Sequence, residues 1–268
     1  MPELPDVEHF RRTFAGGAAG HRVSEVVVTD PGILRDVTAA ELDQALRGHR
    51  FEEPERRGKW VIAWTDGPAL VLHFGMTGDI LWAADASDRH PHDRVIVVLD
   101  HGEIRYRNMR KFGGVWLAGS RDEVDGLLAR LGPDALDVGR AGFLRLLETR
   151  RGRIKAVLLD QSFIAGVGNL LADEALWRAR IHPARRVEEI PVDERGALFR
   201  ELRSVIRRQT VDRYPAGFRS RWNDARGRVG ARCPRCRTEL ARTVVGGRTT
   251  YLCPSCQRLS RDLLALRS

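Results

Sequence analysis

The spacing of hydrophobic residues changes along the chain, from alternation in the first half to helical spacing in the second. Residues 3–15 place Val7, Phe10 and Phe14 on one face behind an acidic start, which predicts a short amphipathic helix. Seven β-prone segments follow, separated by turn signals. They are residues 22–29, 59–65, 69–74, 79–83, 95–99, 103–107 and 115–118. Many short strands at this spacing predict a β-sandwich or barrel.

From about residue 121 the apolar positions follow the helical period. The segments with this period are residues 124–131, 143–147, 154–159, 170–179 and 194–208. A connection rich in Gly and Arg, residues 213–230, leads to the only cysteines of the chain. We therefore expect an α+β protein in three parts. These are an N-terminal β-sandwich domain with flanking helices (1–120), a helical domain (121–226) and a small C-terminal module (227–268).

The composition is that of a globular protein: 268 residues, 43% hydrophobic and 30% charged. No apolar run approaches the roughly 20 residues that a membrane helix needs. The first residues, MPELPDVEHFRR, lack the apolar stretch of a secretory signal. We expect a cytoplasmic protein without a membrane partner.

Positive charge is concentrated at the C-terminal end. Residues 201–268 hold 16 Arg and five acidic residues, a balance of +11 within a total of +9, so the first 200 residues sum to −2. This distribution favours a polyanion as the partner, and a basic tail kept for solubility is the alternative. Only Lys59, Lys111 and Lys155 are lysines among 45 basic residues, which makes them candidates for positions where an ammonium is needed.

All four cysteines fall in two Cys-x-x-Cys pairs, Cys233/Cys236 and Cys253/Cys256. This spacing predicts one structural Zn²⁺ held by four thiolates. Two disulfides are the alternative, and a cytoplasmic chain without other cysteines argues against them. The metal would supply much of the folding free energy of so small a module.

Between the two cysteine pairs, residues 243–245 and 249–252 are β-prone and flank Gly246-Gly247, which predicts a hairpin. Arg248 lies at its tip. A tip arginine is usually only solvated, but the surrounding positive charge favours a contact with phosphate.

A second candidate for phosphate binding is the stretch Ala165–Asn169, which contains Gly166-x-Gly168 between two predicted helices. Such a turn can present backbone N–H groups, and the next helix begins at about Leu170 with its positive dipole end toward them. A helical hairpin that merely packs is an equally good interpretation of this pattern.

Taken in order, the motifs of this chain resemble the formamidopyrimidine-DNA glycosylase / endonuclease VIII family over the whole length. They are Met1–Glu8, Arg57–Lys59, His73–Gly78, Arg110–Gly113, Leu131–Asp134, Ala165–Asn169 with Ala172–Leu176, Ile181–Pro183 and the four-cysteine module. The formamidopyrimidine branch is the closer one, because the other branch typically begins Pro-Glu-Gly-Pro.

The resemblance implies a monomeric, bifunctional DNA glycosylase and AP lyase of base excision repair. It also implies a helix-two-turn-helix domain, a zinc-finger β-hairpin, and damaged double-stranded DNA as the partner at the bacterial nucleoid. A non-catalytic zinc protein that recognises damaged or bent DNA is the alternative, and RNA binding through the zinc module is a third interpretation.

The required chemistry fits the first residues. Base excision with strand cleavage needs an amine that attacks C1′ of the deoxyribose and becomes an iminium. Once Met1 is removed, Pro2 offers a secondary amine with a pKa of about 8, against about 10.4 for a lysine. Glu3 is placed to move protons as general acid and base. Alternatively, Pro2 and Glu3 only start a helix.

The resemblance implies further contacts with the lesion and the DNA. Met76, Arg110 and Phe112 would fill the gap left by the flipped base, although Met76 and Phe112 could instead belong to the core. Phosphate contacts are implied for Lys59, His73, Asn169 and Arg248. Lys155 corresponds to a family lysine near the lesion, and with Pro2, Glu3 and Lys59 it completes the expected catalytic set.

Four departures from the family pattern leave the preferred lesion open. Asp6 replaces a glutamate, Asn108-Met109 replaces Asp-Pro, and Leu171 stands where tyrosine is common. The segment before Cys233 is short and lacks the Gly-Gly-Ser/Thr stretch of the family's loop over 8-oxoguanine. A ring-opened purine, a hydantoin, an oxidised pyrimidine and an abasic site all remain candidate substrates.

Overall fold

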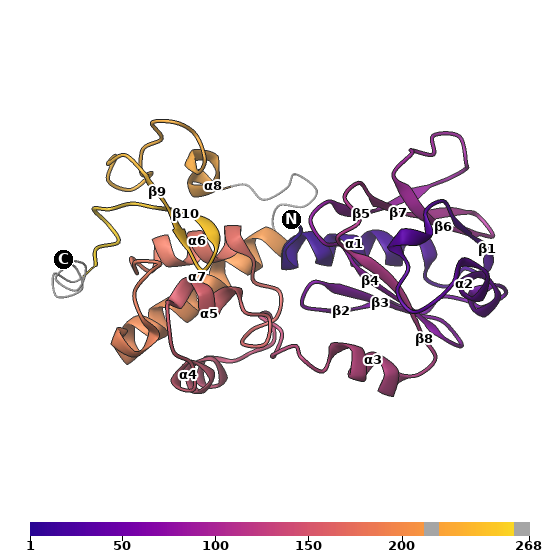
Figure 1. Cartoon of the computed structure of the whole chain (residues 1–268), viewed down its shortest axis with the longest axis horizontal. Coiled ribbons are helices and arrows are strands. Elements are labelled where there is room, and N and C mark those ends of the chain that lie inside the picture. The colour runs from indigo at the N-terminus through magenta and orange to yellow at the C-terminus, as the bar shows by residue number, and fades with distance from the viewer. Residues whose placement is uncertain (212–219, 260–268) are drawn as a thin grey trace. The chain divides into compact units, whose positions relative to one another are not determined.

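A computed structural model describes residues 1–211 and 220–259. The chain divides into two compact units, Met1–Arg130 and Leu131–Ser268, which are described separately below. Figure 1 labels the elements of both units. No helix in the described ranges is long and apolar enough to cross a membrane.

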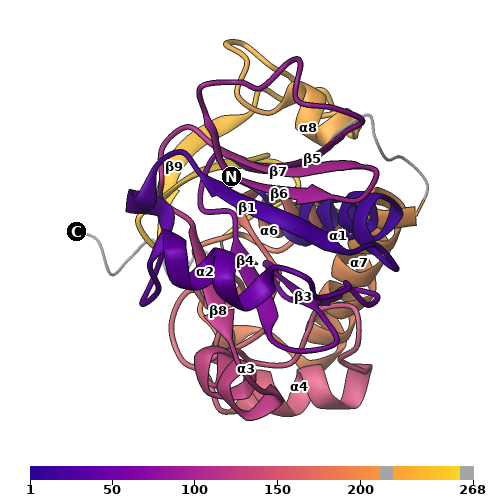
Figure 2. The same cartoon turned by 90° about the vertical axis from the view of Figure 1, so that its right-hand side faces the viewer.

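The first unit is a β-sandwich. One antiparallel sheet has the order β1-β6-β7-β5, and the other has the order β2-β3-β4-β8. Their strands are β1 (Val23–Val28), β2 (Glu55–Arg57), β3 (Trp60–Trp64), β4 (Ala69–His73), β5 (Gly78–Ala83), β6 (Asp93–Leu99), β7 (Gly102–Asn108) and β8 (Gly114–Ala118). Figure 2 shows the first sheet as a layer above β3, β4 and β8. The predicted sandwich is confirmed.

Helices cover the sandwich of the first unit. They are α1 (Leu4–Ala18), the 3-10 turn η1 (Pro31–Ile33), α2 (Ala39–Leu46) and α3 (Arg121–Leu128). Helix α1 contacts strands of both sheets. Its apolar face buries Phe10 against Phe74, with ring centroids 4.6 Å apart, and Phe14 against Phe51 at 5.0 Å. This packing fixes the N-terminus of the chain against the sandwich.

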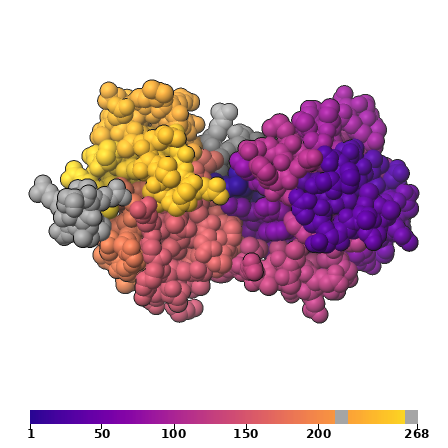
Figure 3. All heavy atoms as spheres, viewed as in Figure 1, coloured from indigo at the N-terminus to yellow at the C-terminus, as the bar shows by residue number. Residues whose placement is uncertain are grey.

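The second unit is helical and carries the C-terminal hairpin. Its elements are α4 (Arg140–Glu148), α5 (Ile154–Leu159), α6 (Asn169–Arg178), the 3-10 turn η2 (Val187–Glu189), α7 (Val192–Val211), α8 (Arg221–Ala225), β9 (Ala241–Val245) and β10 (Arg248–Leu252). Helix α6 is its centre, because every residue from Leu171 to Trp177 is buried. Figure 3 shows the atoms of the C-terminal segment, in yellow, on the surface of this unit.

Candidate functional site

The N-terminal residues are held by the first turn of α1. Glu3 is the N-cap residue, its backbone N–H donates to Asp6 Oδ2 at 2.8 Å, and its side chain is 1% exposed. The proline in the first turn is Pro5, whereas Pro2 precedes the cap. A helix start therefore accounts for Pro5 and partly for Glu3, but it gives Pro2 no role.

Several ionisable groups of the first unit surround this end. Burial raises the pKa of Asp6, while the Glu3 N–H, the chain terminus and Lys59 act in the opposite direction. Burial, and secondarily the charge of Lys59, lowers the pKa of His73 to about 4. His73 is therefore neutral at pH 7, where it can still donate a hydrogen bond to phosphate. Lys59 thus lies close to both Asp6 and His73.

Lys59 is positioned by the tight β2–β3 hairpin. Arg57 pairs with Trp60, so Gly58 and Lys59 form a two-residue loop. Gly58 has a φ of 58°, the left-handed conformation that glycine adopts without strain at the first position of a type II′ turn. This turn places the Lys59 side chain at the end of the sheet, half-buried.

The three expected void fillers lie on two loops that touch. Gly75, before Met76, has a φ of 58°, and a Cβ there would come within 2.5 Å of the backbone at Phe112 and Gly113. Met76 and Phe112 are 40% and 60% exposed, so they are not core residues. The Arg110 guanidinium lies 4.8 Å from the centre of the Phe112 ring. The structure therefore brings all three side chains to one place on the first unit.

Asn108 connects these two loops and was noted in the sequence only as a departure. It is fully buried, and its Nδ2 donates to Phe74 O at 3.2 Å and to the Tyr106 hydroxyl at 2.9 Å. Its Oδ1 accepts from Thr77 Oγ1 at 3.2 Å and from the Lys111 N–H at 2.9 Å. Asn108 thus holds the Met76 turn and the Arg110–Phe112 loop together.

The neighbouring Lys111, one of the three lysines of the chain, also has a structural role. Its Nζ lies 2.9 Å from Asp30 Oδ2, and its backbone has a φ of 54°. The Arg35 guanidinium donates to Gly113 O at 2.9 Å. The loop that carries Arg110 and Phe112 is therefore fixed on both sides.

We expect Asn108→Asp, which introduces the family's usual residue, to destabilise this protein by about 1–3 kcal/mol. The Tyr106 hydroxyl donates to His73 O at 2.8 Å, so it must accept from residue 108. Burial raises the pKa of Tyr106, which keeps this hydroxyl protonated. An aspartate would place a carboxylate oxygen against Phe74 O without a donor. Denaturant unfolding measures the change, and unchanged stability would contradict this role.

In the second unit Lys155 is buried in a charge network. Its Nζ lies 2.5 Å from Asp173 Oδ1 and 2.7 Å from Thr250 Oγ1, and neither charged side chain is exposed. Asp173 Oδ2 accepts from Arg226 Nε at 2.9 Å. This network joins α5, α6 and the segment after α8 to strand β10. The structure therefore places Lys155 inside the unit.

The same network positions the two candidate phosphate contacts of this unit. Thr249 O accepts from Asn169 Nδ2 at 3.2 Å and from Lys155 Nζ at 3.3 Å. Arg248, the residue before Thr249, is exposed at the hairpin tip. The tip is the predicted two-residue turn, since Gly246 and Gly247 have φ values of 58° and 71°. Asn169 and Arg248 are thus brought close together.

Asn169 begins α6, with Gly168 as the N-cap residue, in agreement with the predicted turn before a helix. Residues 165–168 are buried, and the Gly166 N–H donates to Gln161 Oε1 at 3.0 Å. The Gly166 N–H is therefore used within the unit, and this group of the turn is not presented to a phosphate. Asn169 Oδ1 is buried and accepts no hydrogen bond within the described residues.

The four cysteines converge as a tetrahedral metal site requires. All four Sγ atoms lie within 4.8 Å of one another. Sγ separations are 3.4 Å for Cys236–Cys253, 3.5 Å for Cys236–Cys256 and 4.0 Å for Cys233–Cys256. Zn–S bonds near 2.3 Å imply separations of about 3.8 Å in a tetrahedron. The cysteines therefore fit one structural Zn²⁺.

Two tryptophan side chains pack in one cluster with Cys233 and Cys253. The Trp177 indole N–H donates to Cys233 Sγ at 3.4 Å, and its ring stacks on Trp222 at 4.9 Å. The Arg235 guanidinium lies 4.6 Å from the Trp177 ring and donates to Trp177 O at 3.2 Å. These contacts connect the metal site to α6, and no pattern in the sequence marks them.

We expect Trp177→Phe to accelerate zinc loss to a chelator by roughly 10-fold, because hydrogen bonds to ligand atoms typically contribute this much to metal retention. The phenyl ring keeps part of the stacking but removes the N–H together with the rest of the five-membered ring, a loss that the control variant shares. Trp222→Phe is the matched control, since Trp222 Nε1 has no hydrogen-bond partner in the described residues. The rate of zinc release is measured with a colorimetric chelator. Equal rates from the two variants would refute the contribution of the N–H.

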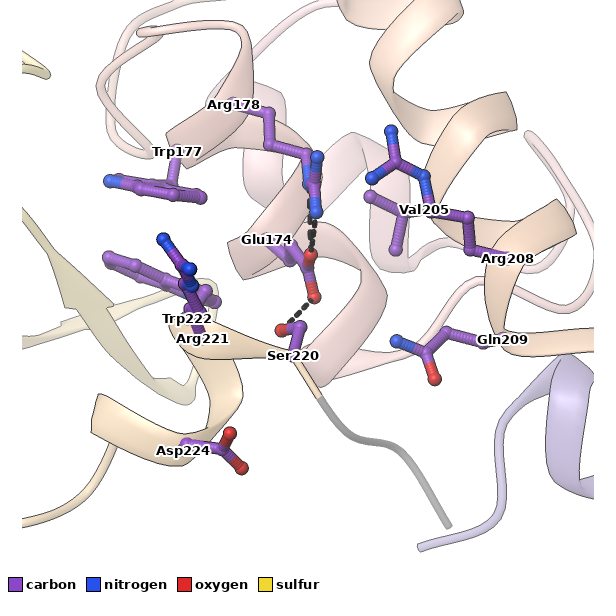
Figure 4. Close-up of a pocket in the computed structure, with 10 residues that line it drawn as sticks. All are labelled: Glu174, Trp177, Arg178, Val205, Arg208, Gln209, Ser220, Arg221, Trp222 and Asp224. Atoms are coloured by element: carbon purple, nitrogen blue, oxygen red, sulfur yellow. Dashed lines mark hydrogen bonds and ion pairs between the residues drawn. The ribbon is translucent and has the colours of Figure 1, made fainter. Parts of the chain in front are cut away.

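A cavity of about 410 Å³ lies beside this stack, between α6, α7 and α8. Figure 4 shows Glu174 in its wall, bonded to Ser220 and Arg178. Glu174 Oε2 accepts from Ser220 Oγ at 2.7 Å and Oε1 from Arg178 Nη2 at 2.7 Å. The segment where the family's loop over the lesion would occur includes residues 212–219, which lie outside the described residues.

Comparisons with known proteins cover almost the whole chain. Three family models match: the formamidopyrimidine-DNA glycosylase N-terminal domain at residues 1–115, the H2TH domain of the same enzymes at 131–215, and a zinc finger found in FPG and IleRS at 230–259. The formamidopyrimidine-DNA glycosylase of Pelotomaculum thermopropionicum is 35% identical, over 97% of this chain and 100% of that protein. The Thermus thermophilus enzyme of the same name is 37% identical, over 96% and 98%.

Solved structures of the same family are similar to this chain over almost its whole length. Lactococcus lactis Fpg in complex with DNA containing an abasic site is 27% identical and superimposes with a TM-score of 0.86, over 96% of this chain and 100% of that chain. MutM in complex with DNA containing carbocyclic 8-oxo-G is 28% identical, with a TM-score of 0.87 and the same coverage.

Fold, zinc centre and comparisons together define a DNA repair enzyme, a bifunctional glycosylase and AP lyase of base excision repair with one structural Zn²⁺. The chain belongs to the formamidopyrimidine-DNA glycosylase family. The expected enzyme class, fold and metal are confirmed.

Proposed function

We propose that the protein excises oxidised or ring-opened purines from double-stranded DNA, with Pro2 as nucleophile and Glu3 as general acid and base. The observation that carries this proposal is the first turn of α1. It buries the Glu3 carboxyl at the cap and leaves Pro2 outside the helix, one residue away. Relatives named formamidopyrimidine-DNA glycosylase and a structure with 8-oxo-G DNA support purine lesions.

Pro2 acts as the nucleophile once Met1 is removed. Its nitrogen forms a bond to C1′, the N-glycosidic bond breaks with its electrons on the base, and Glu3 supplies the proton that opens the sugar. The resulting iminium is cationic and acidifies C2′–H. Loss of that proton expels the 3′ phosphate, a second elimination expels the 5′ phosphate, and water finally releases the amine.

The remaining residues bind and hold the DNA. Met76, Arg110 and Phe112 enter the space of the flipped nucleotide, because they are exposed on two joined loops of the first unit. Phosphate contacts are assigned to Lys59, His73, Asn169 and Arg248. The buried pairing of Lys155 favours a supporting role for it, in place of a direct catalytic one.

We also propose an oligomeric state, a domain division and a cellular location. One chain carries the complete expected set of residues, so we propose a monomer. The division into a catalytic sandwich domain, a helical domain and a zinc module fits the three matched regions. We further propose that the substrate is chromosomal DNA and that the enzyme acts in the cytoplasm, at the nucleoid of a bacterium; the named relatives are bacterial proteins.

A panel of duplexes tests the substrate. Otherwise identical DNAs would carry 8-oxoguanine, a ring-opened guanine, a hydantoin, an oxidised pyrimidine or an abasic site, and single-turnover excision would be followed on each. We expect the two purine lesions to be excised fastest and the abasic site to be cut without a glycosylase step. Fastest excision of the oxidised pyrimidine would overturn the substrate assignment and leave the enzyme class intact.

A further inference from the structure

A cluster of three metal-ligating side chains lies in the first unit, outside the residues assigned above. His21 precedes β1, and Asp100 and His101 form the turn between β6 and β7. Strands β1 and β6 pair antiparallel with Val23 opposite Leu99, so the start of β1 lies beside this turn (Figure 1). Residues 79 positions apart in sequence are thereby brought together.

The three side chains point toward one atom. His21 Nδ1 lies 2.7 Å from Asp100 Oδ1, and His101 Nδ1 lies 3.3 Å from the same oxygen. The two imidazole rings stack, with centroids 3.4 Å apart and an angle of 21° between their planes. Both ring nitrogens therefore approach the same carboxylate oxygen, and all the candidate ligand atoms lie within 4.8 Å of one another. The two stacked rings would rotate apart to direct their nitrogens at one cation.

The backbone holds this arrangement in place. The Asp100 N–H donates to Arg22 O at 3.2 Å, and the Arg22 N–H donates to Asp100 Oδ2 at 3.3 Å. The N–H of His21 donates to Ala18 O at 3.0 Å, and its O accepts from the Phe51 N–H at 3.0 Å. The hydrogen bond to Asp100 Oδ2 orients the carboxylate, so that Oδ1 points toward the two imidazoles. Such support is what a preformed metal site requires.

We propose that His21, Asp100 and His101 form a second metal site, which binds a late first-row divalent cation of the Zn²⁺ class and is distinct from the four-cysteine centre. Two imidazoles and one carboxylate suit Zn²⁺, Ni²⁺ or Cu²⁺, whereas Mg²⁺ and Ca²⁺ prefer oxygen ligands. Bonds near 2.05 Å place ligand atoms about 3.3 Å apart in a tetrahedron. The His101–Asp100 separation already matches this value, and the His21–Asp100 hydrogen bond would lengthen.

The exposure of the three side chains determines how a cation reaches the site and how fast it leaves. The side chains of His21, Asp100 and His101 are 38%, 46% and 35% exposed, so a cation reaches them directly and water completes its coordination. Such a site exchanges its ion quickly, in contrast to the four-cysteine centre, which has two buried thiols.

Trp82 provides a reporter for the test. Its ring lies 6.2 Å from that of His101, and the residue is 45% exposed. The full-length protein with its zinc centre filled would be titrated with Ni²⁺ at pH 7.5 in a non-chelating buffer. We expect one equivalent to bind with saturable quenching of tryptophan fluorescence. Trp82→Phe should retain Ni²⁺ binding, measured by equilibrium dialysis, and lose most of the quenching.

Substitution of the proposed ligands distinguishes Ni²⁺ binding at this site from binding at other histidines. We expect His21→Ala and His101→Ala each to weaken Ni²⁺ binding by about 10-fold or more. His49→Ala is the matched control, because His49 makes the same 2.7 Å contact with an aspartate, Asp66, without a second imidazole. Unaltered affinity in the His21 and His101 variants, an equal loss in the His49 variant, or no saturable binding would each overturn the proposal.

Discussion

Retention of Met1 is expected to abolish base excision and strand cleavage while DNA binding persists. A lysine inserted between Met1 and Pro2 would prevent removal of Met1, and the Pro2 nitrogen would stay a non-nucleophilic amide. We expect the single-turnover rate to fall at least about 10³-fold, as for the loss of other covalent nucleophiles. Gel-based cleavage of a lesion duplex measures the rate, and gel-shift titration measures binding.

Glu3→Gln is the matched control for this prediction. It retains the amine, and a glutamine can still accept the cap hydrogen bond, but it cannot transfer a proton. We expect excision of an intact lesion to fall by about 10²–10⁴-fold, whereas a preformed abasic site still forms the covalent adduct. Undiminished excision by the Met1-retaining variant would show that another amine is the nucleophile.

The second large effect concerns the stability of the second unit. Lys155→Met should lower the free energy of unfolding by about 3–5 kcal/mol, because it leaves the buried Asp173 carboxylate without its closest cation. The remaining Arg226 contact at 2.9 Å favours the lower end of this range. Denaturant unfolding followed by fluorescence measures the change, with zinc content determined in parallel.

Lys111→Met is the control for Lys155→Met. It removes the same ammonium from an ion pair of similar length, 2.9 Å to Asp30, but this lysine is 43% exposed and water replaces its partner. A much smaller change is expected there. If the two variants lost the same stability, burial of the Lys155 pair would not be the cause.

The strands of the first unit could be predicted because alternating apolar residues mark them, and each of the seven predicted segments overlaps an observed strand. Strand β2 was missed since its three residues, Glu55–Arg57, are all charged and none is fully buried. Helix α2 was also missed, although Thr38 and Glu41 form a capping box that could have revealed its start.

In the candidate site, too, some features could be predicted from the sequence and others could not. Motifs with fixed spacing, such as the two cysteine pairs and the Gly246-Gly247 tip, predicted local geometry that the structure bears out. The partners of Lys155 and Trp177, and the Phe74 and Thr77 partners of Asn108, could not be predicted, because these contacts join segments distant in the chain. The burial of Lys155 in particular depends on Asp173 and Thr250, which no local pattern connects to it.

The central claim is that the chemistry occurs on the nitrogen of Pro2. Borohydride reduction of the enzyme mixed with abasic-site DNA, followed by proteolysis and mass spectrometry, tests it most directly. The account predicts one covalent adduct per chain, on the N-terminal peptide that begins at Pro2. An adduct on Lys59 or Lys155 instead, or no adduct under conditions where the DNA is cut, would contradict it.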